Sequence, residues 1–247
     1  MKVYFVGAGP GDPELLTIKA KRLLENCKCC IYAGSLISDE VMSLVSKEAK
    51  LHDSSSMTLG QIIKVVDDCK KGGVDLVRLH SGDPSIYGAI LEQMNELDKL
   101  SVRYEVVPGV SSFQAAAAAL SLELTVPERA QTVILTRATG RTPVPPEQDL
   151  TILSKARTTM CIFLSVQMIG EVVKKLRPEY GADSPVAVVF HASRPDQMII
   201  TGLLGDIEEK VGSAGVDKTA MIIVGPALSR SGAASRLYAA DFPHGCR

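Results

Sequence analysis

The chain has 247 residues, of which 46% are hydrophobic, and this suits one large α/β domain or two small ones. Its 27 basic and 28 acidic residues give a formal net charge of −1, which does not resemble the basic footprint of a nucleic-acid binder, so we expect no nucleic-acid partner. No apolar run approaches the roughly 20 residues of a membrane span. The N-terminus enters a strand directly, without a signal-peptide pattern, so we expect a cytoplasmic protein with no membrane partner.

The cysteines and histidines follow no metal-binding spacing. Three of the six cysteines cluster at Cys27, Cys29 and Cys30, and Cys69, Cys161 and Cys246 are scattered. The four histidines lie far apart in the sequence. We therefore expect reduced thiols in a packed interior and no protein-bound metal.

The first strand, Val3–Val6, runs into a glycine-rich loop, and a helix with apolar positions from Leu15 to Leu24 follows. Strand, glycine loop and helix together resemble a dinucleotide-binding turn. The G-x-G-x-x-G fingerprint, however, needs a glycine where Asp12 stands. The Asp12 carboxylate would also repel a pyrophosphate, so a nicotinamide site fits this loop poorly.

Short strands and helices then alternate, which predicts a parallel sheet with right-handed crossovers. The expected strands are Cys29–Tyr32, Lys50–His52, Leu76–Leu79 and Arg103–Val107. The expected helices are Asp39–Val45, one capped by Thr58 that runs to Asp68, one from Ser85 or Ile86 to Leu97, and one that carries Ala115–Ala119.

Two of the strands end in turns of small residues. The strand Leu76–Leu79 leads into Ser81–Pro84, where Gly82 can adopt positive φ and Ser85 is the expected N-cap. The strand Arg103–Val107 leads into Pro108–Ser112. Ligands bind open α/β sheets at the carboxyl ends of the strands. These turns are either part of a ligand site or ordinary strand-to-helix connections.

After a linker at Thr125–Pro127 the second half begins a new pattern. Its expected strands are Thr132–Thr136, Met160–Leu164, Val186–His191, Met198–Thr201 and Ala220–Val224, and its expected helices are Ile169–Leu176 and Leu204–Val211. The short gap between the third and fourth of these strands favours an antiparallel pair. We therefore predict an N-terminal, mainly parallel α/β domain at 1–125 and a C-terminal mixed α/β domain at 126–247.

Four motifs in this order resemble the tetrapyrrole methylases over nearly the whole chain: Gly7–Asp12, Ser81–Pro84, Pro108–Ser112 and Thr219–Met221. Three further stretches are similar to the branch that methylates C11 of precorrin-4 or cobalt-precorrin-4: Tyr32–Leu36, Leu124–Glu128 and Thr136–Pro143. Uroporphyrinogen III methyltransferases of the same family place an aspartate base where Ala33 stands. No lysine occurs in Ser54–Ser56, where their paired acid lies, so no catalytic residue carries over.

The resemblance implies a two-domain α/β fold with S-adenosylmethionine in a cleft between the domains, an anionic tetrapyrrole substrate and a homodimer. The cofactor-binding residues that it implies are Pro10, Ser81, Gly82, Asp83, Ile86, Ser111, Ser112, Leu164, Ala192 and Ala220. The substrate-binding candidates are Tyr32, Ser35, Arg137 and Arg141. His191 and Arg194 flank Ala192, and they either lie near the cofactor or solvate a strand end.

The residue types suit these roles. Backbone groups at Gly82 and Asp83 can bind the amino-acid end of the donor, and the Asp83 carboxylate can neutralise its ammonium. Ile86 and Leu164 can wall the adenine, or they belong to the core. Arginine forks match the carboxylates of a tetrapyrrole. The alternatives are another precorrin methyltransferase, an rRNA ribose methyltransferase, a non-catalytic S-adenosylmethionine-binding module and a nicotinamide oxidoreductase.

Overall fold

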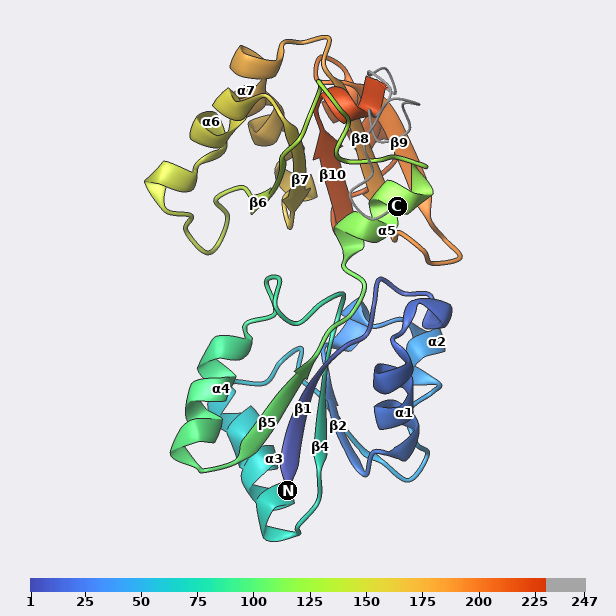
Figure 1. Cartoon of the computed structure of the whole chain (residues 1–247), viewed down its shortest axis with the longest axis vertical. Coiled ribbons are helices and arrows are strands. Elements are labelled where there is room, and N and C mark those ends of the chain that lie inside the picture. The colour runs from blue at the N-terminus through green and yellow to red at the C-terminus, as the bar shows by residue number, and fades with distance from the viewer. Residues whose placement is uncertain (230–247) are drawn as a thin grey trace, which may run out of the picture. The chain divides into compact units, whose positions relative to one another are not determined.

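The computed structural model describes residues 1–229, without the side chain of Ser35, and so Cys246 lies outside the described residues. The chain forms two compact units. The first contains residues 1–115 together with 193–196, and the second contains residues 116–192 and the chain from 197 onward. The change from one unit to the other falls inside helix α5 (Ser112–Ala119). Each unit is built on its own sheet (Figure 1).

The sheet of the first unit has the order β3-β2-β4-β1-β5, and all of its neighbouring strands run parallel, as the strand-helix alternation predicts. Its strands are β1 (Lys2–Gly7), β2 (Cys29–Tyr32), β3 (Lys50–Asp53), β4 (Leu76–His80) and β5 (Arg103–Val107). Because the strands are parallel, all five carboxyl ends lie at one edge.

Helices cover both faces of this sheet (Figure 1). Helices α1 (Ile18–Asn26) and α2 (Asp39–Met42) pack on one face, and α3 (Leu59–Lys71) and α4 (Ile90–Lys99) pack on the other. The neighbouring strands β1 and β4 therefore send their following helices, α1 and α4, to opposite faces. In open α/β sheets, ligands bind at the carboxyl ends of two strands whose following helices diverge in this way.

In the first unit, two helix starts differ from the prediction. A single helix from Leu15 is wrong, because a short 3-10 turn (Pro13–Leu15) precedes α1. Asp12 caps this turn by accepting a hydrogen bond from the Glu14 N–H at 2.8 Å, and Thr17 caps α1 separately. Two caps in succession interrupt the apolar periodicity.

The second difference concerns α4, which begins at Ile90 rather than near Ser85. Ser85 is not its N-cap, because the Ser85 N–H and hydroxyl both donate to the Asp83 carboxylate. Tyr87 and Ala89 have φ angles of 55° and 49°, which are incompatible with a right-handed helix. The segment after Pro84 is therefore an irregular loop that the residue types alone do not reveal.

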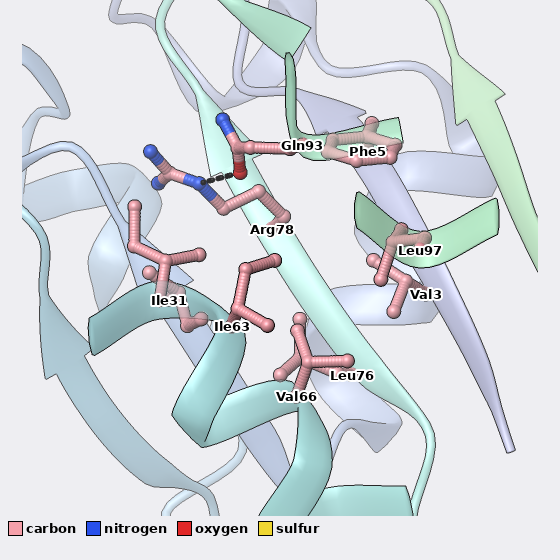
Figure 2. Close-up of a pocket in the computed structure, with 10 residues that line it drawn as sticks. Val3, Phe5, Ile31, Ile63, Val66, Leu76, Arg78, Gln93 and Leu97 are labelled. Atoms are coloured by element: carbon pink, nitrogen blue, oxygen red, sulfur yellow. Dashed lines mark hydrogen bonds between the residues drawn. The ribbon is translucent and has the colours of Figure 1, made fainter. Parts of the chain in front are cut away.

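A buried charge lies beneath the α3 and α4 face of this sheet. The Arg78 side chain projects from β4 into a small cavity with mostly apolar walls, where its Nε donates to Gln93 Oε1 at 3.2 Å (Figure 2). Burial lowers the pKa of Arg78 to about 10. Burial, followed by the nearby Arg78 charge, lowers the pKa of the neighbouring His80 to about 3, so this imidazole is neutral at physiological pH.

The sheet of the second unit is mixed, as predicted, with the order β6-β7-β10-β8-β9. Its strands are β6 (Val133–Arg137), β7 (Thr159–Phe163), β8 (Pro185–Phe190), β9 (Met198–Leu203) and β10 (Ala220–Val224). Strands β6 and β7 are parallel, and β10 is antiparallel to both β7 and β8. The antiparallel pairing of β8 with β9 confirms the predicted pair.

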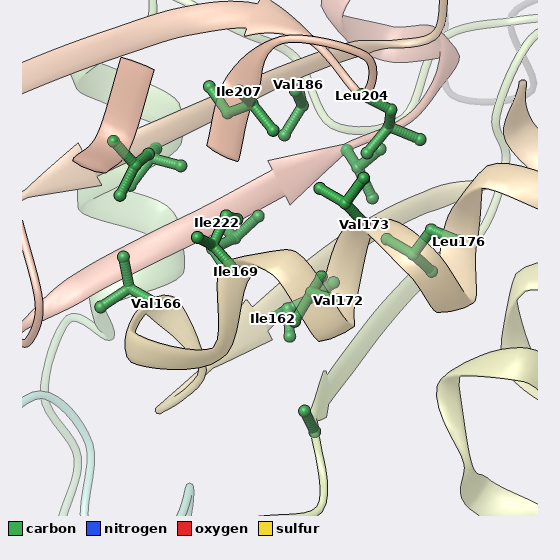
Figure 3. Packing of buried hydrophobic residues seen from close by; sticks show 14 of the residues in the cluster. Ile162, Val166, Ile169, Val172, Val173, Leu176, Val186, Leu204, Ile207 and Ile222 are labelled. Atoms are coloured by element: carbon green, nitrogen blue, oxygen red, sulfur yellow. The ribbon is translucent and has the colours of Figure 1, made fainter. Parts of the chain in front are cut away.

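Helices α7 (Ile169–Tyr180) and α8 (Ile207–Ser213) supply much of the core of this unit. Figure 3 shows Val172 and Leu176 of α7 and Ile207 of α8 near Ile162 and Ile222 of the sheet. A further helix, α6 (Leu150–Leu153), was not expected, because one turn is too short to give a periodic signal.

Cys27, Cys29, Cys30, Cys69 and Cys161 are free and buried. Burial raises the pKa of the Cys161 thiol to about 12, which makes it unreactive. Within residues 1–229 there is no cluster of His, Cys, Asp and Glu that could hold a metal ion. No helix of that same part of the chain has the length and apolar character to cross a membrane.

Candidate active site

Three loops meet at the carboxyl edge of the first sheet. The loops after β1 and β4 are joined by a pair of backbone hydrogen bonds: Gly9 N donates to Gly82 O at 3.2 Å, and Gly82 N donates to Gly9 O at 2.8 Å. Ala8 N also donates to His80 O at 2.7 Å. The predicted motifs Gly7–Asp12 and Ser81–Pro84 are therefore paired in space.

The loop after β5 packs against the other two through glycines. A Cβ atom added to Gly109 would lie 2.3 Å from Gly82 O and 2.9 Å from Gly7 Cα. One added to Gly7 would lie 2.6 Å from Gly109 N. Gly82 itself has a φ of 64°, which favours glycine. The backbones of all three loops thus touch directly, and no side chain fits between them.

Asp83 ties two of these loops together. Its Oδ2 accepts a hydrogen bond from Gly109 N at 2.9 Å, and its Oδ1 accepts from the N–H of Ser85 at 2.8 Å and from the Ser85 hydroxyl. Burial raises the pKa of this carboxyl group, but the hydrogen bonds from Ser85 and Gly109 outweigh it, so the net pKa is lowered. Asp83 is therefore a fixed negative charge at this edge.

The other cofactor candidates of the first unit lie along the same loops. Pro10 and Ser111 are buried, Ile86 and Ser112 are half-buried, and Ser81 is exposed. A Cβ atom on Gly82 would lie 3.6 Å from Ser111 Cα. The substrate candidate Tyr32 ends β2, and the backbone of Ser35 lies in the 3-10 turn Gly34–Leu36. The structure thus brings the first-unit candidates to one edge of one sheet.

The candidates of the second unit also gather at one sheet end. Arg137 pairs with Phe163 in the β6–β7 register, and Leu164 follows Phe163 directly. Ala220 pairs with Phe190 in the β8–β10 register, and His191 N donates to Thr219 O at 3.1 Å just before Ala192.

Unusual backbone conformations mark this end of the second sheet. Leu164, His191 and Thr219 have φ angles of 53°, 46° and 52°, although none of them is glycine. Leu164 is 64% exposed. Left-handed conformations of bulky residues cost energy and concentrate at ligand sites. Nothing in the residue types signals these conformations, so they could not be predicted from the sequence.

The predicted substrate loop after β6 is held by its own arginine. Arg137 donates from Nη1 to Thr142 O at 3.0 Å and from Nη2 to Pro143 O at 2.9 Å, whereas Arg141 is exposed. Within residues 1–229, neither the Nε–H of Arg137 nor the exposed Arg141 guanidinium makes a hydrogen bond.

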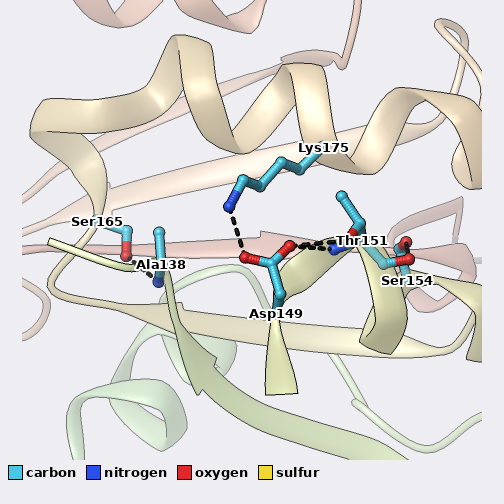
Figure 4. Close-up of polar contacts among 6 residues, drawn as sticks. All are labelled: Ala138, Asp149, Thr151, Ser154, Ser165 and Lys175. Carbon is cyan, nitrogen blue, oxygen red and sulfur yellow. Dashed lines mark hydrogen bonds and ion pairs between the residues drawn. The ribbon is translucent and has the colours of Figure 1, made fainter. Parts of the chain in front are cut away.

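Both ends of this loop are anchored (Figure 4). The buried Ser165 hydroxyl accepts from Ala138 N at 2.8 Å and donates to Phe163 O at 2.6 Å. At the far end, Lys175 Nζ of α7 contacts Asp149 Oδ2 at 2.6 Å, and Asp149 also caps α6. Ser165 therefore fixes the backbone on both sides of Leu164 and at the start of the Arg137 loop.

We expect Ser165→Ala to destabilise the protein by about 1–3 kcal/mol, because the buried Ala138 N–H loses its acceptor. Urea unfolding followed by circular dichroism measures this change. The exposed Ser43, which follows α2 and donates its hydroxyl to Glu40 O of that helix, provides the matched control variant Ser43→Ala. Equal stability of the two variants would show that Ser165 has no anchoring role.

Comparison with known proteins agrees with this geometry. The family described as Tetrapyrrole (Corrin/Porphyrin) Methylases matches residues 2–208, and the chain belongs to this family. It is 51% identical to the cobalt-precorrin-4 C(11)-methyltransferase of Methanocaldococcus jannaschii, over 98% of this chain and 95% of the relative. It is 44% identical to the precorrin-4 C(11)-methyltransferase of Pseudomonas aeruginosa, over 99% of this chain and 98% of the relative.

Two solved structures of tetrapyrrole methyltransferases have folds similar to that of this chain. The X-ray structure of a cobalamin biosynthetic enzyme, cobalt precorrin-4 methyltransferase, matches with a TM-score of 0.90 and 42% identity, and covers 92% of this chain and 95% of its own. The uroporphyrin-III C-methyl transferase of Thermus thermophilus complexed with S-adenyl homocysteine matches with a TM-score of 0.79 and 28% identity, over 94% of this chain and all of the other.

Proposed function

We propose that this protein is an S-adenosylmethionine-dependent methyltransferase that acts at C11 of precorrin-4 or cobalt-precorrin-4, in the biosynthesis of the corrin ring of cobalamin. The observation that carries this proposal is the near full-length identity of 51% to a cobalt-precorrin-4 C(11)-methyltransferase. The relatives of both names support the reaction at C11, and they do not favour one metal state of the substrate.

The loops of the first unit suit the methyl donor. The donor supplies an electrophilic methyl group on a sulfonium, and its amino-acid end carries an ammonium. Asp83, with its lowered pKa, offers a fixed negative charge to that cation. Backbone groups of Gly82 and Asp83 can bind the amino and carboxylate groups, and half-buried Ile86 can pack on the adenine. Pro10, Ser81, Ser111 and Ser112 complete the proposed donor site in this unit, and the proposal adds Leu164, Ala192 and Ala220 of the second unit.

The chemistry requires alignment more than proton transfer. An electron-rich pyrrole carbon can attack a sulfonium methyl group without a strong base. Holding the two reactants in line can contribute up to about 7–11 kcal/mol to lowering the barrier. The lowered pKa values of Asp83 and His80 make both groups poor proton acceptors, which agrees with a reaction of this kind.

The Arg137 loop is our proposed contact for the substrate carboxylates. Changing both Arg137 and Arg141 to methionine should raise the KM for the tetrapyrrole by about tenfold or more, since each charge-assisted contact contributes roughly 1.5–3 kcal/mol. The KM for the methyl donor should stay unchanged. Steady-state kinetics with each reactant varied in turn tests this assignment, and unaltered turnover at low tetrapyrrole concentration would refute it.

Product analysis tests the proposed reaction. The purified protein is incubated with S-adenosylmethionine labelled with carbon-13 in the methyl group and with either cobalt-loaded or metal-free precorrin-4. We expect one added methyl group by mass spectrometry, and carbon NMR should place it at C11. Methylation at another carbon would indicate a different precorrin methyltransferase, and methylation of ribosomal RNA alone would indicate the ribose methyltransferase alternative.

A further inference from the structure

Four residues between β8 and β9 belong to the first unit rather than the second. In this segment, residues 193–196, the Ser193 hydroxyl accepts a hydrogen bond from Asp12 N at 3.1 Å. Arg194 donates from Nη2 to Leu36 O at 2.7 Å. The segment is thereby fixed to the loop after β1 and to the 3-10 turn that follows β2, both at the carboxyl edge of the first sheet.

Gly11 provides the surface on which Arg194 lies. A Cβ atom added at Gly11 would lie 2.5 Å from Arg194 Cγ and 3.0 Å from its Nε. The Gly11 carbonyl is itself held by the Ser38 hydroxyl at 2.5 Å. The guanidinium group is therefore placed beside the Gly9–Gly11 loop, which is hydrogen-bonded to Gly82.

The charge of Arg194 is incompletely satisfied. Its Nε is buried and has no hydrogen-bond partner. Within the described residues no carboxylate lies at ion-pair distance from Arg194, whereas the more exposed Arg157 donates to Glu179 from both Nε and Nη2. A guanidinium is always charged, and buried donors in folded proteins are nearly always paired. This pattern points to an acceptor that arrives with a ligand.

We propose that Arg194 binds a carboxylate of one of the two reactants. This proposal rests on the proposed function, since both the methyl donor and the tetrapyrrole of that reaction carry carboxylates. The planar fork of arginine matches a carboxylate in geometry and charge. The Nη hydrogens that Leu36 O does not occupy supply the donors, and the Nη2 contact to Leu36 O fixes the orientation of the guanidinium.

Two variants and a control test the proposal. Arg194→Met keeps an unbranched apolar chain over Gly11 but removes every donor, and Arg194→Lys keeps the charge but loses the fork. Arg22→Met, at an exposed position of α1, is the matched control. Thermal unfolding establishes that each variant is folded. Calorimetry then gives the Kd of S-adenosylhomocysteine, and kinetics gives the KM of the tetrapyrrole.

The two carboxylate sources give different results. If Arg194 binds the donor, Arg194→Met raises the Kd of S-adenosylhomocysteine by about tenfold. The decarboxylated form of that ligand should then bind to wild type and to Arg194→Met with the same Kd. If Arg194 binds the substrate, only the tetrapyrrole KM rises by that factor. Arg194→Lys should recover part of either loss, and Arg22→Met should show none.

Folded Arg194→Met and Arg194→Lys with both constants unchanged would overturn the proposal. So would a lower melting temperature with both constants intact, because Arg194 would then serve only to hold the segment in place. If the methylation assay of the wild-type protein fails, the proposed function fails. Calorimetry with the intact and decarboxylated ligands still shows in that case whether Arg194 binds the carboxylate of S-adenosylhomocysteine.

Discussion

Gly109→Ala is expected to abolish detectable binding of S-adenosylhomocysteine and to destabilise the protein by about 1–3 kcal/mol, the usual range for overpacking. The added methyl group would lie 2.3 Å from Gly82 O and 2.9 Å from Gly7 Cα. Both neighbours are backbone atoms, so no side chain can rotate away. The loops after β1, β4 and β5 must separate, and the donor-binding backbone groups are displaced with them.

Calorimetry and urea unfolding measure the two effects of Gly109→Ala. The matched control is Gly60→Ala on α3, where an added methyl group meets nothing within 4 Å. This control should leave binding unchanged and be neutral or slightly stabilising, because alanine favours helix more than glycine. Wild-type affinity in Gly109→Ala would contradict the convergence of the three loops on the donor.

Asp83→Ala is expected to weaken S-adenosylhomocysteine binding by at least about tenfold, because the fixed charge opposite the ammonium is lost. It should also destabilise the protein by about 1–3 kcal/mol, since Gly109 N and Ser85 N lose their acceptor. Asp83→Asn separates the two effects, because it keeps one acceptor oxygen and removes the charge. Unchanged affinity in both variants would remove Asp83 from the donor site.

The same carboxylate makes a prediction for pH. The folded-state pKa of Asp83 is lowered, so its stabilisation is complete above the unfolded-state pKa of about 3.9 and is lost as the pH falls through the folded value. The stability difference between wild type and Asp83→Ala should therefore be constant from neutral pH down to about 5 and shrink below about 4. A difference that persists at low pH would contradict an ionised Asp83.

Much of the fold follows from local patterns. Alternating apolar strands and amphipathic helices predict the parallel sheet of the first unit, and the short gap before Met198 predicts the antiparallel β8–β9 pair. Because parallel strands end at one edge, the small-residue turns after β1, β4 and β5 must lie near one another. The proximity of Gly7, Gly82 and Gly109 is a consequence of that topology.

The remaining features depend on contacts between distant residues. Arg194 and Leu36 are 158 positions apart, and no local pattern predicts that a turn in the second half of the chain lies against Gly11. Asp83 was expected to be a ligand contact, but its bond to Gly109 N was not. The start of α4 was misplaced because the Asp83–Ser85 turn and the left-handed Tyr87 override a plausible cap.

A crystal structure of the protein with bound S-adenosylhomocysteine is the most direct test of the account. We predict that the amino-acid end of the ligand contacts the backbone of Gly82 and Asp83, and that the ligand lies against the loops that carry Gly9 and Gly109. A ligand bound at another surface, with these three loops making no contact to it, would contradict the assignment of the donor site.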